Sequence, residues 1–354
     1  MNFKTIFVDK NVYSKKKWAL RADSIIKQYP DATVKSVNSH WQIPQLYNMD
    51  PTLWMKTKRD YLVLGIKKTL KQQDNGRSSD YIAVSHANGC LSGCMYCYVA
   101  RRKGGSNPLT VFLNYEELLG SINEHQKERG PKKTPNQCDP YFNVYDIGNN
   151  NDCSLDVKVS PIPLKFIEGF KHMPYAKATF ATKTVNEEAW LSIDPRDSNG
   201  VTHTRIRYSL MPSELSKQVD INTSPISDRI KSINTLVEAG YEVHVNFSPV
   251  VVYDGWEPDW KELWDELNDV LTEQSKQQLK CEVIFLTHSQ KVHDLNMEWN
   301  PKGESRIWQP QIQQTKYNKP DVICYDYKLK KSLVDRFAKG INKYLPYCTV
   351  RYAF

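Results

Sequence analysis

Between residues 202 and 288 the chain alternates between stretches typical of β-strands and stretches typical of α-helices. The first of these helices has Ser224 and Pro225 at its start, as an N-cap and first-turn pair, and Gly240 at its end. Strands are predicted at 202–211, 241–252 and 281–288, and helices at 224–239 and 259–274. Such alternation forms βαβ units around a parallel sheet, open or closed into a barrel, with the chemistry at the carboxyl ends of the strands.

The N-terminal part begins with the same alternation. Strands are predicted at 4–9 and 32–38, with a helix at 15–30 between them. Asn75 and Gly76 mark a turn, after which residues 81–87 are predicted to form one strand that runs straight into a cysteine-rich loop. The cysteines are therefore expected just beyond the end of a strand.

Three of the eight cysteines, Cys90, Cys94 and Cys97, have the spacing C-x3-C-x2-C. The N-terminus lacks the apolar core of a signal peptide, so we expect a cytoplasmic protein whose clustered cysteines bind metal or act in catalysis. A structural zinc site uses four ligands, usually as two pairs, so zinc would need a remote ligand such as His86. An iron–sulfur cube fits better, because three thiolates leave one iron open for a small molecule.

A C-x3-C-x2-C loop after the first strand of a βα protein, with Tyr96 as the aromatic residue before the third cysteine, is the radical S-adenosylmethionine signature. The open iron of such a [4Fe–4S] cluster binds the amino and carboxylate groups of S-adenosylmethionine. An electron passed to the sulfonium then releases a 5′-deoxyadenosyl radical. The loop therefore predicts two cofactors, a [4Fe–4S] cluster held by the three cysteines and S-adenosylmethionine.

The charge balance adds a weaker indication of a partner. The chain has 48 Lys and Arg against 40 Asp and Glu, a formal net charge of +8. An excess of cations favours a polyanion such as DNA, although basic runs are also common on solvated faces. No apolar run approaches the length of a membrane span, so we expect no membrane contact.

The sequence resembles the spore photoproduct lyase family over most of its length. The cluster loop of that family reads GC-x3-C-x-YCY, as residues 89–98 do, and "SHWQIP" and "YLVLGIKK" resemble the part that precedes it. The motifs "RIRYSLMPSEL", "TSPISDRI", "EAGYEVHVNFSPV" and "GWEPDW" then follow in family order between 205 and 260. The resemblance implies an α/β fold: a partial (β/α)6 TIM-type barrel with a small N-terminal α/β unit over 1–75, the barrel over 76–300, and a C-terminal hairpin and helix over 301–354.

The resemblance also implies an activity. Members of this family repair thymine dimers that ultraviolet light makes in DNA: the adenosyl radical abstracts hydrogen from the methylene crosslink, and the linking bond then fragments. We accordingly predict a radical S-adenosylmethionine lyase that cleaves a carbon–carbon bond in damaged DNA. The expected partners are DNA and an electron donor such as flavodoxin or ferredoxin, and the protein is expected to act as a monomer.

The family's site residues carry over one by one. Besides the cluster ligands, Tyr96 would lie against the adenine, and Tyr98 corresponds to a tyrosine proposed to relay a hydrogen atom. Lys183 matches a lysine that pairs with the cofactor carboxylate, as an inward lysine at a strand end needs an anion. Ser209 and Ser248 match positions that line the cofactor site. Without the resemblance, the tyrosines and serines are equally consistent with packing.

One departure from the family lies at residues 145–152. Characterised lyases have a cysteine there that donates the last hydrogen atom to the product, and Asn149 stands at that position here. Cys153 follows, but along a strand it would face the other side unless a bulge or loop turns it, and a plain buried thiol is the alternative. Asn149, Asn151 and Asp152 carry donors and acceptors suited to the ribose hydroxyls and amino group of the cofactor.

The C-terminal segment mixes aromatic and basic residues in the region of the family's DNA-wedging hairpin. Aromatic rings that stack on bases and cations that hold phosphates are what extraction of a base requires. A last barrel strand with a hairpin that closes the core is the alternative. The predicted nucleic-acid contacts are Arg306, Trp308, Tyr325 and Lys328, with Tyr317 also in the segment.

Two other functions stay open at this point. One is a radical enzyme of the same family that modifies a different nucleic-acid or small-molecule substrate, because the hydrogen-donating cysteine is absent. The other is a non-catalytic nucleic-acid-binding protein with a zinc or iron–sulfur site. Metal content separates the second from the enzymes.

Overall fold

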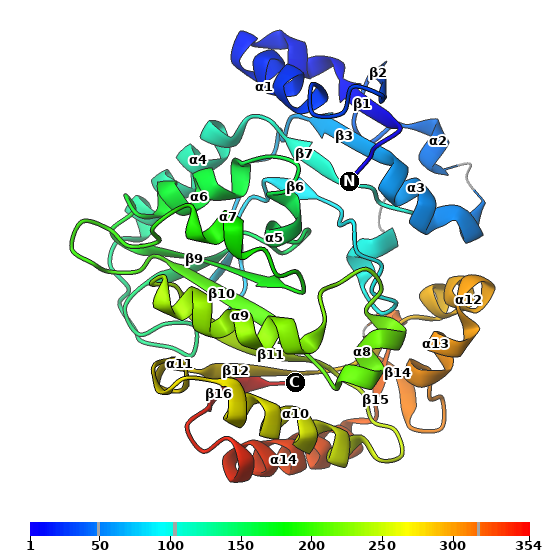
Figure 1. The fold of residues 1–354 in the computed structure, drawn as a ribbon, viewed down its shortest axis with the longest axis vertical. Helices are drawn as coiled ribbons and strands as arrows, with labels where there is room; N and C mark the ends of the chain where they lie inside the picture. Colours follow the sequence, from blue (N-terminus) through cyan, green and yellow to red (C-terminus); the bar gives the residue numbers. More distant parts are fainter. Residues whose placement is uncertain (48–49, 102–104, 317–318) are drawn as a thin grey trace. The chain divides into compact units, whose positions relative to one another are not determined.

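A computed structural model describes residues 1–47, 50–101, 105–316 and 319–354 (Figure 1). The chain divides into two compact units. Unit 1 consists of Met1–Gly93, Cys97–Phe180 and Pro195–Thr204, and unit 2 consists of Cys94–Tyr96, Ala181–Asp194 and Arg205–Phe354. The boundaries expected at 75/76 and 300/301 fall inside unit 1 and unit 2, respectively, so the three-part division stays a prediction.

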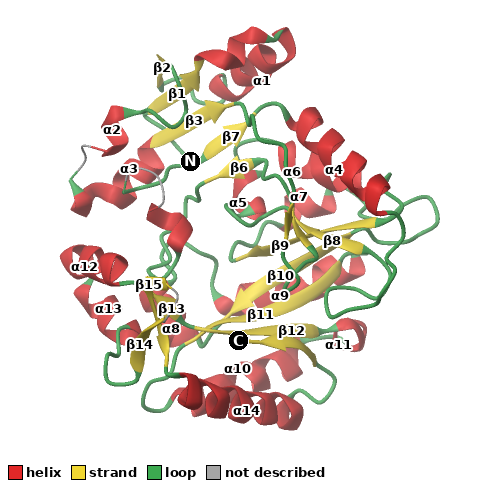
Figure 2. Cartoon of the chain, turned by 180° about the vertical axis from the view of Figure 1, so that it is seen from behind, coloured by secondary structure: helices red, strands yellow, loops and turns green. Residues whose placement is uncertain are grey.

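The first sheet of unit 1 has the strand order β2-β1-β3-β7-β6 (Figure 2). Its strands are β1 (Thr5–Asp9), β2 (Thr33–Val37), β3 (Tyr61–Gly65), β6 (Ala87–Asn88) and β7 (Thr110–Phe112). All neighbours are parallel except β6 and β7. The helices between them are η1 (Lys10–Ser14), α1 (Lys16–Ile26), α2 (Pro44–Tyr47), η2 (Pro51–Leu53) and α3 (Trp54–Asp60). Helix α1 buries Trp18, Ala22 and Ile25 at helical spacing, as predicted.

The other strands of unit 1 follow the order β9-β8-β5-β4, in which β8 is parallel to both neighbours and β4 is antiparallel to β5. They are β4 (Gln73–Asp74), β5 (Tyr81–Ile82), β8 (Asn143–Asp146) and β9 (Ala176–Thr182), with helices η3 (Tyr98–Arg101), α4 (Tyr115–Arg129), α5 (Cys153–Asp156) and α6 (Ile162–Phe170). The single strand predicted at 81–87 is wrong. Strand β5 pairs with β8 whereas β6 pairs with β7, and between them the Val84 amide donates to the Gln72 side chain.

Unit 2 is built on a parallel sheet with the order β16-β12-β11-β10, as the alternating pattern predicted. The strands are β10 (Thr204–Leu210), β11 (Glu242–Val250), β12 (Lys280–Phe285) and β16 (Thr349–Ala353). Every residue of β10 is buried, which is typical of parallel strands covered on both faces. The helices are α7 (Glu187–Leu191), α8 (Ser213–Val219), α9 (Ile226–Glu238), α10 (Trp256–Val270), α11 (Glu273–Gln278) and α14 (Tyr327–Tyr344).

Helix α9 shows one success and one error of the sequence pattern. It ends before Gly240, whose φ of +95° suits glycine. It does not use Ser224 as its N-cap: the N-cap is Pro225, and the Ser224 hydroxyl instead accepts a 2.9 Å hydrogen bond from the Val185 amide. The serine therefore fixes the loop that follows Lys183.

The predicted C-terminal hairpin is present in unit 2. Strands β14 (Gln313–Lys316) and β15 (Lys319–Tyr325) are antiparallel, and β13 (Thr287–His288) pairs with the other edge of β15. Tyr317 lies outside the described residues. Two helices, α12 (Gln290–Trp299) and α13 (Pro301–Ile307), precede the hairpin. Helix α14 follows it and packs beside α10 (Figure 1).

Candidate functional site

The cysteine loop starts at Gly89, where only glycine fits. Its φ is +90°, and a Cβ there would lie 2.5 Å from the Pro108 carbonyl oxygen. The buried ammonium of Lys58, on α3, donates to the carbonyls of Cys90 and Ser92, the second at 3.0 Å. The first residues of the cysteine loop are therefore fixed through their backbone, by the Lys58 side chain and by the close approach of Pro108.

All eight cysteines are free thiols. Burial, followed by the negative charge of Asp152, raises the pKa of Cys90 to about 12. A cysteine must lose its proton to bind iron, so the pKa of Cys90 has to fall when a metal binds. Nowhere in the described ranges do three or more His, Cys, Asp or Glu side chains gather as a single metal ion requires.

In unit 2 a buried carboxylate, Asp220, gathers Tyr96, Lys183 and Arg229. Lys183 directly follows β9, and its ammonium lies 2.8 and 2.9 Å from the two Asp220 carboxylate oxygens. The Arg229 guanidinium, on α9, donates to Asp220 Oδ2 at 3.3 and 3.4 Å. The Tyr96 hydroxyl donates to Asp220 Oδ1 and accepts from Lys183. We call these four residues the charged cluster.

Two cations compensate the buried negative charge of Asp220 in the charged cluster. Burial by itself would raise the pKa of Asp220, but Lys183 and Arg229 outweigh it and lower that pKa below the usual value. Burial and the charge of Asp220 raise the pKa of Tyr96 well above its usual value, so its hydroxyl stays a donor. Sequence reasoning required an anion for Lys183 but missed Asp220 and Arg229, because no local signal identifies which distant carboxylate meets a given lysine.

Ser209 and Ser248 lie on the neighbouring parallel strands β10 and β11 of the same unit. Ser209 is buried, and its carbonyl accepts a 2.7 Å hydrogen bond from the Arg229 guanidinium. Arg229 thus joins Ser209 to the charged cluster. Ser248 is partly exposed near the carboxyl end of β11.

In unit 1 a second buried cluster forms around Asn151. Its amide donates to Asp156 at 2.6 Å and lies 3.1 Å from His86 Nε2, and a longer contact of 3.8 Å reaches the Cys153 sulfur. His86 Nε2 lies 3.3 Å from the Asp156 carboxylate, so this ring nitrogen is engaged by Asp156 and Asn151. We call His86, Asn151, Cys153 and Asp156 the thiol cluster.

Cys153 does not continue a strand, so of the two arrangements considered from the sequence a loop precedes this residue. Strand β8 ends at Asp146, and Cys153 is the first residue of α5, with Asp152 as the N-cap that accepts from the amides of Ser154 and Leu155. The Cys153 side chain is fully buried, and burial raises its pKa well above the usual value. Cys153 is therefore a protonated thiol that is enclosed within unit 1.

Tyr98 and Asn149 meet at the surface of unit 1. The Tyr98 hydroxyl donates to the Asn149 carbonyl at 3.0 Å, and 60% of the Tyr98 residue is exposed. Both residues line a polar pocket of about 170 Å³, together with Lys67 and Lys71. None of the described residues that line this pocket is acidic. The pocket therefore favours an anionic or strongly polar group.

The predicted nucleic-acid contacts differ in exposure. Tyr325 is a correction: it is buried, and its hydroxyl accepts a 2.9 Å hydrogen bond from the Val252 amide, so its ring is not free to stack on a base. The half-buried Trp308 stacks on His293 with a centroid distance of 3.9 Å. The Arg306 guanidinium lies 5.0 Å from the centre of the Tyr253 ring. Lys328 is exposed at the start of α14, beside Tyr327, which is 77% exposed.

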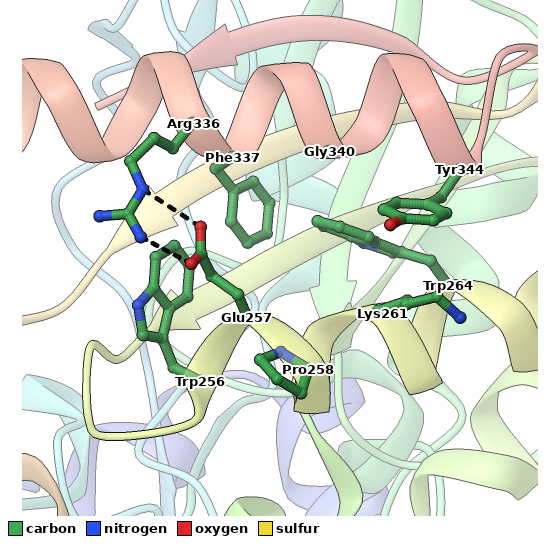
Figure 3. A pocket seen from close by; sticks show the side chains of 9 residues that line it. All are labelled: Trp256, Glu257, Pro258, Lys261, Trp264, Arg336, Phe337, Gly340 and Tyr344. Atoms are coloured by element: carbon green, nitrogen blue, oxygen red, sulfur yellow. Dashed lines mark hydrogen bonds and ion pairs between the residues drawn. The ribbon is translucent and has the colours of Figure 1, made fainter.

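The "GWEPDW" motif has a structural role in unit 2. Trp256 stacks on Phe337 across α10 and α14, and Arg336 pairs with Glu257 at 2.6 and 3.1 Å at the rim (Figure 3). A groove of about 360 Å³ between the two helices is lined by four aromatic rings together with polar and small residues. No helix within the described part of the chain is both long and apolar enough to span a membrane.

Comparison with solved structures shows which fold the chain has. A spore photoproduct lyase double mutant with bound AdoMet and dinucleoside spore photoproduct matches with a TM-score of 0.85 at 19% identity, over 99% of each chain. A spore photoproduct lyase complexed with dinucleoside spore photoproduct gives the same TM-score and coverage at 20% identity. The chain thus has the α/β partial-barrel fold of these enzymes, which confirms the predicted fold class.

The family follows from sequence comparison. The family model for spore photoproduct lyase matches residues 10–354. The spore photoproduct lyase of Bacillus subtilis (strain 168) is 25% identical over 230 residues, 65% of this chain and 63% of that protein. The spore photoproduct lyase of Clostridium acetobutylicum is 25% identical over 300 residues, 83% of this chain and 82% of that protein. This chain belongs to the spore photoproduct lyase family.

Proposed function

We propose that this protein is a radical S-adenosylmethionine lyase that repairs a crosslinked thymine dinucleotide in DNA. One observation carries the proposal: the intact C-x3-C-x2-C loop from Cys90 to Cys97 lies inside a family match that spans residues 10–354. The resident cofactors are a [4Fe–4S] cluster and S-adenosylmethionine. Cys90, Cys94 and Cys97 hold the cluster, and their chemistry fits it, because thiolates are the usual ligands of iron–sulfur clusters.

When bound, the cluster and S-adenosylmethionine supply a 5′-deoxyadenosyl radical. The charged cluster binds the cofactor carboxylate through the Lys183 ammonium, which Asp220 holds in place at 2.8 Å. Because Asp220 also pairs with Arg229, it stays charge-compensated when Lys183 turns toward a second carboxylate. Tyr96 lies beside the adenine, and Ser209 and Ser248 contribute further polar contacts.

On the side of unit 1, Asn149, Asn151 and Asp152 bind the polar groups of the cofactor's ribose and amino end. The side chain of Asp152 also caps α5, and the amide of Asn151 is engaged by Asp156, so these contacts use the remaining acceptor atoms. The Asn151 carbonyl oxygen, which is buried, has no partner within the described residues. An acceptor in this position suits a hydroxyl or ammonium group.

In this proposal the last hydrogen atom comes from the O–H bond of Tyr98, which leaves a tyrosyl radical. One electron from the electron donor and one proton from solvent then restore the tyrosine. An amide at position 149 cannot serve as the donor, and Cys153 is enclosed. Tyr98 is the exposed group beside Asn149, with its O–H directed to the Asn149 backbone.

Arg306, Trp308 and Lys328, together with the exposed Tyr327, contact the DNA strand. The electron donor of flavodoxin or ferredoxin type, the monomeric state and the cytoplasmic location stay predictions.

Metal analysis and cofactor cleavage test the proposal. Protein purified without oxygen should be brown, contain about four irons and sulfides per chain, and cleave S-adenosylmethionine to 5′-deoxyadenosine when reduced. Cys94→Ala should abolish cleavage but leave the fold intact, because a cube with two thiolates is poorly held. Zinc without iron in the wild type, or full cleavage by Cys94→Ala, would contradict the proposal.

A further inference from the structure

A buried polar network in unit 2 meets the middle of the cysteine loop. Its centre is Glu304 on α13, whose side chain is fully buried. His288 Nε2 and His293 Nδ1 lie 2.7 and 2.8 Å from Glu304 Oε1, and Asn296 donates to Glu304 Oε2 at 2.7 Å. The Asn296 amide thus donates to one oxygen of the Glu304 carboxyl group, and the two histidine nitrogens lie at its other oxygen.

Asn296 links Glu304 to the backbone of Met95 by hydrogen bonds. Its amide group donates one hydrogen bond to Glu304 and another to the Met95 carbonyl, at 2.9 Å, while its oxygen accepts from the Trp299 indole at 3.1 Å. Both N–H donors of the amide are used and the residue is fully buried. The amide therefore has one orientation, and aspartate at this position would place an oxygen against two acceptors.

Both the backbone and the side chain of Met95 make hydrogen bonds within unit 2. Its amide donates to the Val219 carbonyl at 3.0 Å, so both of its backbone polar groups are paired. Its side chain is buried, and its sulfur accepts from the Asn300 amide at 3.3 Å. Gly303 leaves room for this contact, because a Cβ there would lie 2.6 Å from Asn300 Nδ2, 2.7 Å from the Met95 sulfur and 2.9 Å from the Gln218 carbonyl oxygen.

Met95 separates Cys94, a predicted cluster ligand, from Tyr96 of the charged cluster. Fixing the peptide groups on both sides of Met95 fixes the directions in which these two neighbouring side chains leave the backbone. We infer that Asn296, oriented by Glu304, is a positioning residue that sets the conformation of the cysteine loop at Met95 and so aims Cys94 and Tyr96. The inference rests on the proposed function for its consequence, and on the contacts above for its geometry.

Hydrogen exchange in the full-length protein without added iron tests the geometry. We expect Asn296→Ala to raise the exchange rate of the peptide that covers Cys94 to Cys97 by about tenfold, because one buried hydrogen bond to the loop is lost. Asn234→Ala is the matched control: this asparagine of unit 2 donates to the Val270 carbonyl at 2.8 Å and accepts two further hydrogen bonds, none of them from the loop. The control should leave exchange in the loop unchanged.

A second variant keeps every polar group. Gly303→Ala presses on the Met95 sulfur and on the Asn300 amide that donates to it, and should also raise exchange in the loop, even if Asn296→Ala folds poorly. In reconstituted protein both variants should lose iron to a chelator about tenfold or more faster than the wild type and Asn234→Ala, as removal of an outer-shell partner typically does. Loop exchange in folded Asn296→Ala equal to that of the control would overturn the inference. If Asn296→Ala does not fold, control-like exchange in Gly303→Ala would overturn it. A wild type that binds no iron would instead overturn the proposed function, while the exchange data still decide the geometry.

Discussion

The charged cluster of unit 2 and the thiol cluster of unit 1 are each built around a buried carboxylate, but their chemistry is opposite. The charged cluster pairs one carboxylate, Asp220, with two cations. The thiol cluster has a carboxylate, Asp156, whose pKa burial raises above the usual value, next to a protonated thiol. The first cluster is suited to a charged ligand group, whereas the second avoids charge.

The difference also concerns unsatisfied atoms. In the thiol cluster the buried His86 Nδ1, Asn151 Oδ1 and Asp156 Oδ1 have no hydrogen-bond partner among the described residues. In the charged cluster every oxygen of Asp220 is paired. Buried unpaired polar atoms are costly, so they identify the place where a bound molecule gains most from new contacts. The comparison therefore predicts recognition of a charged group by the charged cluster and of a neutral polar group by the thiol cluster.

The largest difference between the two clusters is expected in the unfolding free energy when the central carboxylate of each is replaced by an amide. Asp220→Asn leaves two buried cations without their counter-charge and should cost about 3–5 kcal/mol of unfolding free energy. Asp156→Asn removes a carboxylate that has no lysine or arginine partner in its cluster, and should cost about 1–2 kcal/mol. Urea unfolding of both variants measures the two costs. Equal costs would remove the distinction between the clusters.

Tyr98→Phe and Cys153→Ala test which hydroxyl or thiol of unit 1 supplies the last hydrogen atom. Tyr98→Phe should lower the yield of repaired thymine about tenfold or more, while cleavage of S-adenosylmethionine continues. Cys153→Ala should keep repair and lose only about 1 kcal/mol of stability from the missing buried sulfur. Chromatography of 5′-deoxyadenosine and thymine products checks both. Loss of repair in Cys153→Ala alone would assign the role to the enclosed thiol.

The two carboxylates should also show opposite pH trends. A lowered pKa, as for Asp220, gives stability that is present above the unfolded value near 3.8 and is lost as the pH falls. A raised pKa, as for Asp156, gives stability that is present at low pH and is lost as the pH rises through the folded value. From about pH 6 to about pH 3, the cost of Asp220→Asn should shrink and that of Asp156→Asn should grow, by up to about 1.4 kcal/mol per pH unit. Unfolding curves across this range test the signs, and parallel trends would contradict them.

The smallest effect is expected at the polar pocket beside Tyr98. Lys67→Ala and Lys71→Ala should each weaken binding of a phosphodiester-linked thymine dinucleotide by about 0.5–1 kcal/mol, with no change for the phosphate-free dinucleoside. Lys68, exposed and outside the pocket lining, supplies the control variant Lys68→Ala. Fluorescence titration measures the affinities. An equal loss of affinity in Lys68→Ala would show that the effect comes from the overall positive charge and not from the pocket.

The sequence predicted the parts of this molecule that depend on local pattern. Periodicity located β10, α9, β11 and β12, because burial of strands and helices leaves a repeat in the residues themselves. The cysteine spacing and the family motifs identified the loop. Local rules failed where tertiary contacts compete: Ser224 serves a neighbouring loop instead of capping a helix, and the aromatic Tyr325 is buried.

The unpredicted site residues share one property. Asp220 and Asn296 act through partners far away in the chain, since Asp220 meets Lys183 and Asn296 meets Met95, and Arg229 and Glu304 join these two pairs. A single sequence carries no signal for such pairs, since any buried carboxylate satisfies the charge argument equally well. Lys183 was predicted to need an anion, and in the structure Asp220 of the same chain is that anion, without a bound ligand.

The repair reaction itself tests the central claim most directly. Reconstituted, reduced protein is incubated without oxygen with S-adenosylmethionine and a crosslinked thymine dinucleotide, and both 5′-deoxyadenosine and the dimer are quantified. The account predicts that the dimer disappears and free thymine residues form, although Asn149 replaces the family's cysteine. Formation of 5′-deoxyadenosine with no loss of the dimer would contradict it and show that this family member acts on another substrate.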